Sequence, residues 1–302
     1  MARPAAASVF PALPAWVGWL ALGTVLLVRC LTVGWVADDL VFMDAARRET
    51  FGELLSGRHG ILGYYRPVSR ELYFWLFGRL LGLGPFALHL VNALVFALMV
   101  GVFAATVRRL CGARSAWFAA ALLILFPPTG ALLSWISCAQ DLIATLLVVL
   151  AMWWWVSGAS PWWVAIACAL APLAKESAIV APGLVLALEL MWRRAGTLPE
   201  RVQRVAPAFL GAAVAIAIQL AVRSGWPAGT AVAIWSPAQF ANAWRLPIDF
   251  LVTWWPPHAL AGIGAALRDS FALTAFVTVT AIAAAWAAER VLRGRVGGVT
   301  PC

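Results

Sequence analysis

The chain has 302 residues, of which 63% are hydrophobic, and it carries only 22 basic and 13 acidic side chains. This composition excludes an ordinary water-soluble enzyme. A helix needs about 20 apolar residues to cross a bilayer, and apolar runs near this length recur along the chain. The formal charge of +9 would indicate nucleic-acid binding in a soluble protein, but these arginines separate apolar runs, so we expect no nucleic-acid partner.

The apolar runs predict an all-α, polytopic membrane bundle with about eight spans, at 15–37, 84–107, 116–138, 142–156, 162–174, 179–192, 205–222 and 270–288. A ninth run, 250–267, contains two consecutive prolines, which interrupt a helix interior, so we leave it outside the count. The first run is too long for a signal peptide and is expected to remain as a helix. We expect one membrane domain over residues 1–302, in which 38–83 is a loop, 84–192 holds helices two to six and 193–302 holds the C-terminal helices.

Arginines near the span ends predict the orientation, because short cytoplasmic loops retain positive charge. One face would carry Arg3, Arg108, Arg109, Arg114, Arg193, Arg194, Arg201, Arg204, Arg290, Arg293 and Arg295. The loop 38–83 then lies on the extracytoplasmic face, and its ETFGELL and SRELYFWLFGRLL segments predict two amphipathic surface helices. We expect a multi-pass protein of the cell membrane, which in a bacterium is the inner membrane.

Asp38 and Asp39 follow the first predicted span directly. A carboxylate there has water on one side and a low-dielectric wall on the other, which suits a general base. The alternative is a solvated helix end. Two adjacent carboxylates can also bind a divalent metal, so no cofactor is certain and a metal remains open.

Lys175 is the only lysine of the chain and is followed by Glu176. The short span before it places Lys175 below the outer headgroups, where an ionisable group is costly unless it is paired or lines a wet cavity. Lys175 would hold a lipid-borne phosphate there. The alternative is an ion pair that packs helices, between Lys175 and another carboxylate.

Three further polar positions belong to the predicted outer face. Asp141 begins the fourth span, as a cavity acid or as a simple helix cap. Tyr65 and Arg66 precede Pro67; Arg66 is either a phosphate clamp or an interfacial side chain that reaches for water. His89 and Asn92 share one face of the second span, and we expect them to join helices by hydrogen bonds.

Five segments together resemble the membrane glycosyltransferases of the GT-C fold, nearest to the lipid-linked mannosyltransferase branch related to protein O-mannosyltransferases. They are DDLVFMDAA, YYRPVSREL, LHLVNALVFAL, SWISCAQDLIATL and LAKESAIVAPGLVLALEL, and the resemblance covers about residues 10–195. It implies transfer of a sugar from a polyprenyl phosphate carrier to a hydroxyl of a protein, glycan or lipid acceptor on the extracytoplasmic side. Asp38 or Asp39 would be the base, Arg66 and Lys175 would face the carrier phosphate, and Asp141 would be the second acid, with Tyr65 and Glu176 beside them.

Some positions differ from the family pattern. Where many relatives carry Gly-Arg before the acid at Asp141, this chain has Ala139 and Gln140, and a His-Pro pair is replaced by Pro127 and Pro128. Two other functions therefore stay open. One is a transporter or lipid flippase with Lys175 near its moving site, and the other is a catalytically silent relative that binds lipid carriers.

Overall fold

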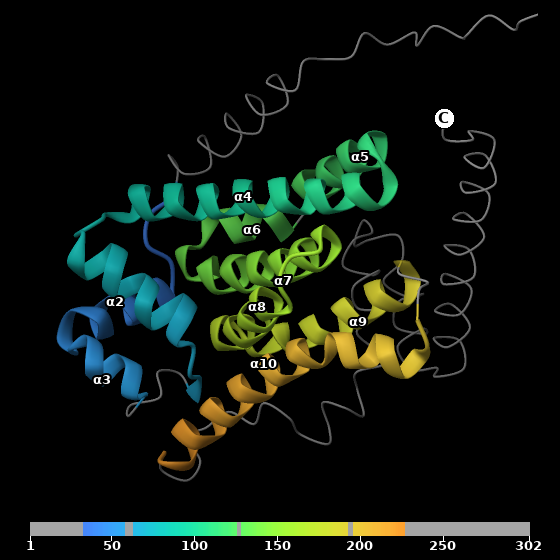
Figure 1. Ribbon diagram of the computed structural model, residues 1–302. Coiled ribbons are helices and arrows are strands. Elements are labelled where there is room, and N and C mark those ends of the chain that lie inside the picture. The colour runs from blue at the N-terminus through green and yellow to red at the C-terminus, as the bar shows by residue number, and fades with distance from the viewer. Residues whose placement is uncertain (1–32, 58–62, 126–127, 193–195, 227–302) are drawn as a thin grey trace, which may run out of the picture. The chain divides into compact units, whose positions relative to one another are not determined.

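The computed structural model describes residues 33–57, 63–125, 128–192 and 196–226, and these residues are all-helical, with no strand among them (Figure 1). The chain divides into two units, 1–232 and 233–302, and every described residue belongs to the first. The predicted span 270–288, the run 250–267 and most of the span 15–37 therefore lie outside the described residues. The expectation of one domain over the whole chain stays a prediction.

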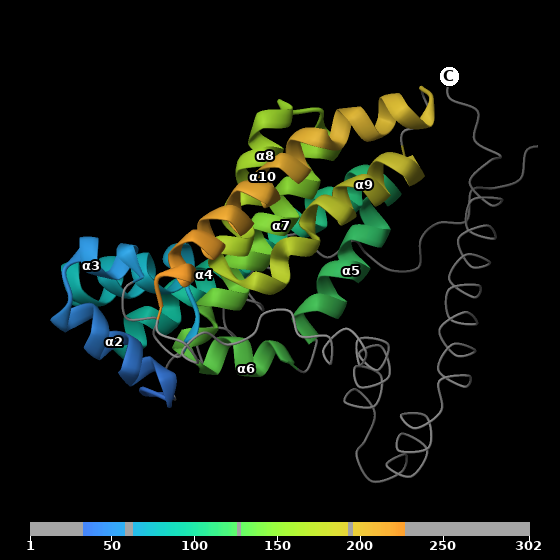
Figure 2. The same cartoon turned by 90° about the horizontal axis from the view of Figure 1, so that it is seen from below.

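The described residues of the range 38–80 form more helical segments than the two that were predicted. They are α2 (Asp38–Arg48), α3 (Phe51–Ser56) and the π-helices η2 (Pro67–Glu71) and η3 (Phe74–Leu80). The helix α3 begins at a capping box, in which Thr50 and Glu53 bond each other's backbone N–H groups. Both views place α2 and α3 at one end of the helix bundle (Figures 1 and 2).

The position expected for Asp38 and Asp39 needs correction. They do not end a helix, since residues 33–36 are not helical; they form the first turn of α2. The residue before them, Ala37, has a φ of 43°, a backbone conformation that is rare for a residue with a side chain. Two acids in a first turn are favourable there because the helix dipole is positive at its N-terminus.

The bundle consists of α4 (Pro85–Cys111), α5 (Ala113–Leu125), α7 (Ala139–Ser157), α8 (Pro161–Ala174), α9 (Ala181–Trp192) and α10 (Leu198–Ser224). Among the described residues, three segments are long and apolar enough to cross a membrane: Pro85–Cys111, Ile136–Ser157 and Leu198–Ser224. Ala113–Ile124 and Pro161–Ala174 are shorter apolar helices. The membrane character is thus supported for three spans, and the count of eight stays a prediction.

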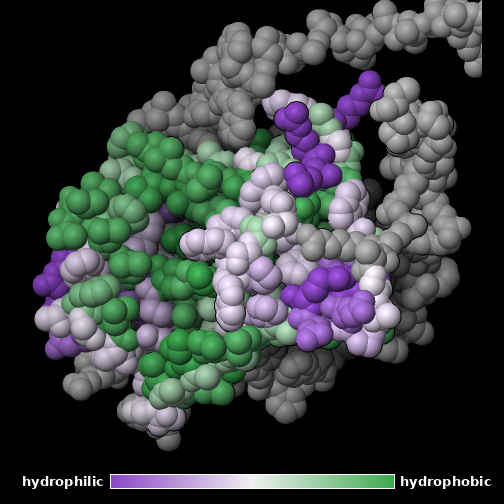
Figure 3. Space-filling model, viewed as in Figure 1, coloured by the Kyte–Doolittle hydropathy of each residue, from purple (hydrophilic) through white to green (hydrophobic). Residues whose placement is uncertain are grey.

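The outer face of α4 carries apolar side chains at every fourth position. Phe86, Leu90, Leu94 and Leu98 are all exposed, whereas the opposite face buries Phe96 among other residues. Residues four apart share one face of an α-helix, so this is a continuous apolar stripe. Hydrophobic residues also cover much of the surface in Figure 3. A surface of this kind suits hydrocarbon rather than water.

The predicted span 116–138 is wrong as a single helix. The chain instead forms α5, which ends at Leu125, then α6 (Pro128–Ser134) and the 3₁₀ turn η4 (Ile136–Cys138). The reason is the Pro127-Pro128 pair, because proline lacks the N–H that continues a helix and favours a first-turn position.

The bundle has two chemically different ends. At the arginine end, Arg109 donates a hydrogen bond to the carbonyl oxygen of Val156 (3.1 Å), and Arg204 pairs with the buried Glu189 (2.7 Å). At the loop end, η2 packs on α7 and α8, and α2, α3 and η3 pack on η2. The membrane sides of these two ends stay a prediction.

Candidate functional site

The site forms at the loop end, where the helical path breaks between α8 and α9. Lys175 is extended (φ −157°, ψ 134°), and the 3₁₀ turn η5 (Glu176–Val180) follows it. The carbonyl oxygen of Pro172 accepts a hydrogen bond from Gln219 of α10 (2.7 Å), and that of Ala174 accepts one from Ser69 of η2 (2.5 Å). A broken helix at membrane depth requires such partners from the protein, since hydrocarbon provides none.

Lys175 and Asp141 form an ion pair on the wall of a cavity. The distance from Nζ to Oδ1 is 2.5 Å, and the two side chains are 29% and 38% exposed. The cavity has a volume of about 220 Å³ and is otherwise lined by Ala144, Thr145, Val148, Ser177, Ala178 and Val180. Lys175 therefore fits both of the interpretations made from the sequence. It forms an ion pair with a carboxylate, and it also lines a cavity that could hold a phosphate.

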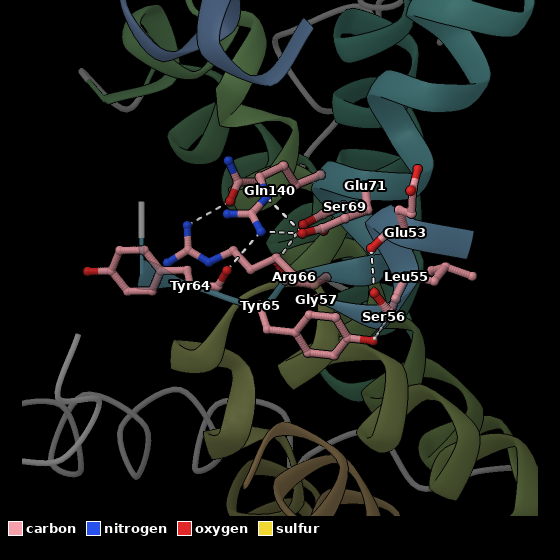
Figure 4. Close-up of polar contacts among 12 residues, drawn as sticks. Glu53, Leu55, Ser56, Gly57, Tyr64, Tyr65, Arg66, Ser69, Glu71 and Gln140 are labelled. Carbon is pink, nitrogen blue, oxygen red and sulfur yellow. Dashed lines mark hydrogen bonds and ion pairs between the residues drawn. The ribbon is translucent and has the colours of Figure 1, made fainter. Parts of the chain in front are cut away.

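Arg66 is held from three sides. Its guanidinium pairs with Glu176 (Nη2 to Oε2, 2.8 Å), donates from Nη1 to the Gln140 side chain (2.6 Å) and lies 4.2 Å from the centre of the Tyr64 ring. The Arg66 and Glu176 side chains are only 14% and 10% exposed. Figure 4 shows Arg66 between Tyr64 and Gln140. A guanidinium with these contacts is fixed in position and keeps further N–H groups for a ligand.

The ion pairs of Arg66 and Lys175 are linked through neighbouring residues of the chain. Lys175 and Glu176 are consecutive, and their partners belong to different pairs: Lys175 binds Asp141, whereas Glu176 binds Arg66. Gln140 and Asp141 are also consecutive, and Gln140 completes the Arg66 contacts while its Nε2 donates to the carbonyl oxygen of Ser137 (3.1 Å). The predicted residues Arg66, Asp141, Lys175 and Glu176 are thus brought together at one end of the bundle.

Sequence reasoning missed Gln140 and Tyr64 as members of this cluster. Gln140 was noted only as a departure from a family pattern, yet its side-chain oxygen accepts a hydrogen bond from Arg66, a contact that an arginine at this position could not make. Tyr64 had no signal beyond its place next to Tyr65. The aromatic ring two residues before an arginine is the only local hint of the stacking contact.

Asp39 is completely buried and its carboxylate is fully engaged. Oδ1 accepts hydrogen bonds from the backbone N–H (2.7 Å) and the hydroxyl (2.5 Å) of Ser137, and Oδ2 accepts one from the N–H of Val36 (3.0 Å). The neighbouring Asp38 is partly exposed, and within the described residues its side chain makes no hydrogen bond or ion pair. Of the two predicted bases, Asp38 is the one whose carboxylate has no partner among the described residues.

The segment at Ser137 relates these acids to the cavity. Asp39 accepts two hydrogen bonds from Ser137, and Asp141 follows four residues later in the first turn of α7. The beginning of α2 and the Lys175–Asp141 pair therefore lie around the same short segment, η4. Over residues 33–57, 63–125, 128–192 and 196–226 no group of three His, Cys, Asp or Glu side chains is arranged to hold a metal ion. A divalent metal stays a prediction.

Tyr65 occupies a structural position, with its ring directed away from Arg66 (Figure 4). Its hydroxyl donates a hydrogen bond to the carbonyl oxygen of Leu55 (2.8 Å), so it ties η2 to α3. Burial, and to a smaller extent the Glu71 carboxylate, raises the pKa of Tyr65 above its ordinary value. The phenol thus remains protonated at neutral pH and keeps this hydrogen bond.

His89 and Asn92 confirm the expectation that they join segments by hydrogen bonds. The ring nitrogens of His89 face the carbonyl oxygens of Leu133 (3.0 Å) and Gly34 (3.3 Å). Asn92 donates to the carbonyl oxygen of Ile136 (3.0 Å) and accepts from Tyr73 (2.8 Å). These contacts hold η4 and the segment before α2 against α4, and so they position Asp38 and Asp39.

No protein-family model matches this chain, and no curated protein and no solved structure matches it either.

Proposed function

We propose that the chain is a membrane glycosyltransferase that moves a sugar from a polyprenyl phosphate carrier to an acceptor hydroxyl on the extracytoplasmic side. One observation carries the proposal: the Lys175–Asp141 pair lines an open cavity at the end of an apolar bundle, and the fixed Arg66 lies beside it. Two cations next to lipid-facing helices fit a ligand that has an apolar chain and an anionic phosphate.

Each side chain has a defined task in this reaction. The bond between the sugar carbon and the phosphate oxygen breaks, and the acceptor oxygen attacks the sugar carbon from the opposite face. Lys175 and Arg66 offset the negative charge that grows on the leaving phosphate, a contribution that is often a large part of catalysis. The acceptor proton passes to a carboxylate, for which we propose Asp38.

The choice of Asp38 over Asp39 rests on accessibility. Asp39 is fully buried, and its oxygens already accept three hydrogen bonds, so its role is to anchor α2 on Ser137. A base must come within hydrogen-bond reach of the proton it takes. Asp38 is partly exposed in the same helical turn, which allows an acceptor to approach it.

The enzyme assay uses the full chain in detergent with radiolabelled polyprenyl phosphate sugars and candidate acceptors. We expect Lys175→Ala and Asp38→Asn to lower the rate of transfer about 100-fold or more, because each removes a group that acts in the transition state. Asp44→Asn is the matched control, since Asp44 forms an exposed pair with Arg48 on α2. Equal rates for all three variants would refute the proposed site.

The broken helix between α8 and α9 also favours a second candidate, a transporter or lipid flippase, because discontinuous helices surround the substrate in many transporters. Vesicles that hold the purified chain distinguish the two functions. If solute or lipid crosses the bilayer while no sugar donor is consumed, transport is the function. Reporter fusions after Asp44 and after Arg193 test the membrane sides; we expect opposite sides, and the same side for both would contradict the proposed location.

A further inference from the structure

The two ion pairs of the site differ in how firmly they are held. Arg66 contacts Glu176, Gln140 and Tyr64, and the Arg66–Glu176 pair is nearly buried, at 14% and 10% exposure. In the described part of the chain Lys175 has one side-chain partner, Asp141, and that pair is 29% and 38% exposed. A partly exposed pair exchanges partners readily, whereas separating a buried pair leaves an uncompensated charge.

The charges of the site balance without a ligand. Arg66 and Lys175 are each matched by a carboxylate, Glu176 and Asp141. Within the described residues of the site, an approaching phosphate would meet no unpaired cation, and it would be repelled by Asp141. Binding of an anion at Lys175 therefore requires that Asp141 gives up the ammonium group.

The local structure favours this exchange. Lys175 is the extended residue at the helix break, so its flexible side chain extends from a point outside the regular helices. Asp141 lies in the first turn of α7, where the helix dipole stabilises a carboxylate that has lost its partner. The cavity beside the pair supplies space, and Thr145 and Ser177, whose side chains carry hydroxyls, are among its lining residues.

We propose that Asp141 is a placeholder for the carrier phosphate: it holds Lys175 in the unliganded protein, and a phosphate-bearing ligand displaces it. This inference rests on the proposed function, and it gives Asp141 a positioning role in place of direct contact with the phosphate. It also predicts opposite effects on phosphate affinity for the loss of the Asp141 and Glu176 carboxylates. Removing the charge of Asp141 strengthens phosphate binding, whereas removing the charge of Glu176 weakens it, because Arg66 loses its fixed position.

Equilibrium binding of farnesyl phosphate to the full chain in detergent tests the inference, and inorganic phosphate forms a second arm. We expect Asp141→Asn to lower the Kd by up to about fivefold, as for loss of a partly exposed pair. Lys175→Met raises the Kd at least about tenfold, since a charge-assisted contact is lost. The double variant binds as Lys175→Met does, because without the ammonium group there is nothing for Asp141 to occupy. Tighter binding in the farnesyl arm alone assigns the site to lipid-borne phosphate; an equal gain in both arms assigns it to phosphate in general.

Three further variants control the measurement. Asp141→Glu keeps the carboxylate and is expected to bind phosphate as the wild type does. Asp44→Asn removes a charge from an exposed ion pair elsewhere on α2 and is expected to leave the Kd unchanged. Asp141→Ser serves as a second neutral variant if Asp141→Asn fails to fold. If both neutral variants bind more weakly than or equally to the wild type while Lys175→Met binds more weakly, the placeholder role is overturned and the phosphate site stands. If Lys175→Met changes neither arm, the proposed function itself fails.

Discussion

The helices α8 and α10 approach each other closely at Gly211 of α10, and this contact yields a sharp prediction. A Cβ atom added at Gly211 would overlap the carbonyl oxygen of Ala165 in α8 and would lie 2.9 Å from the carbonyl carbon, where ordinary contacts measure 3.4–4 Å. The obstacle is backbone, which cannot rotate away. Gly211→Ala therefore forces α8 and α10 apart by about half an ångström or more.

The expected cost follows from two opposing contributions. Overpacking against a rigid neighbour costs about 1–3 kcal/mol. Alanine in a helix interior recovers about 0.5–1 kcal/mol relative to glycine. We expect a net loss of about 1 kcal/mol, which lowers the Tm by roughly 2–4 °C in a chain of this size. Thermal unfolding of the full chain in detergent measures it.

Gly183 in α9 supplies a matched control, because a Cβ atom there meets nothing within 4 Å. Gly183→Ala should leave the Tm unchanged or raise it slightly, since only the helix preference acts. A Tm for Gly211→Ala at or above that of the wild type, together with the expected behaviour of Gly183→Ala, would refute the described packing of α10 on α8.

Three further predictions concern hydrogen bonds and charges away from the reacting groups. Ser69→Ala leaves the Ala174 carbonyl oxygen at the helix break without its side-chain donor and should cost about 1–2 kcal/mol in thermal unfolding; Ser56→Ala, which removes an exposed hydroxyl, should cost less than about 0.5 kcal/mol. Arg204→Met removes the guanidinium that pairs with the buried Glu189 and should lower the free energy of unfolding by about 2 kcal/mol, after allowance for the 39% exposure of Arg204. Arg48→Met is the control, because it breaks an exposed pair and should change this free energy little. Tyr65 has a raised pKa in the folded protein, so its contribution to stability is complete below about pH 10 and is lost as the pH rises further, because the unfolded chain ionises first. The stability of Tyr65→Phe should therefore fall less than that of the wild type between about pH 8 and 11. Parallel stability curves for the two proteins would contradict this.

Helices with uninterrupted apolar runs could be predicted well from the sequence. The predicted 142–156 corresponds to Ala139–Ser157, and the predicted 162–174 corresponds to Pro161–Ala174. In both cases local signals set the ends: Gly158 adopts a left-handed conformation after α7, and Pro161 occupies the first turn of α8. The helix α2 was missed because its sequence is short and polar, and its start depends on the turn at Ala37.

The site could be predicted only as a set of residue types on one side of the bundle. Arg66, Asp141 and Lys175 were selected because charges are rare in apolar segments. Their pairing could not be predicted, since Arg66 and Glu176 are 110 residues apart and Lys175 had several carboxylates available. The role of Gln140 depends on the same long-range contact, and no local pattern marks a glutamine that will meet a distant arginine.

The helix break at Lys175 has a consequence for biosynthesis. The carbonyl oxygen of Ala174 accepts its hydrogen bond from Ser69, which is synthesised before α8, and that of Pro172 accepts one from Gln219, which is synthesised after α8. A nascent chain that has inserted α8 but not yet α10 therefore keeps the Pro172 oxygen without its final donor, and water must satisfy it in the meantime. The packing of α10 on α8 replaces that water with the Gln219 side chain, so the helix break becomes fully bonded only when the last described helix is in place.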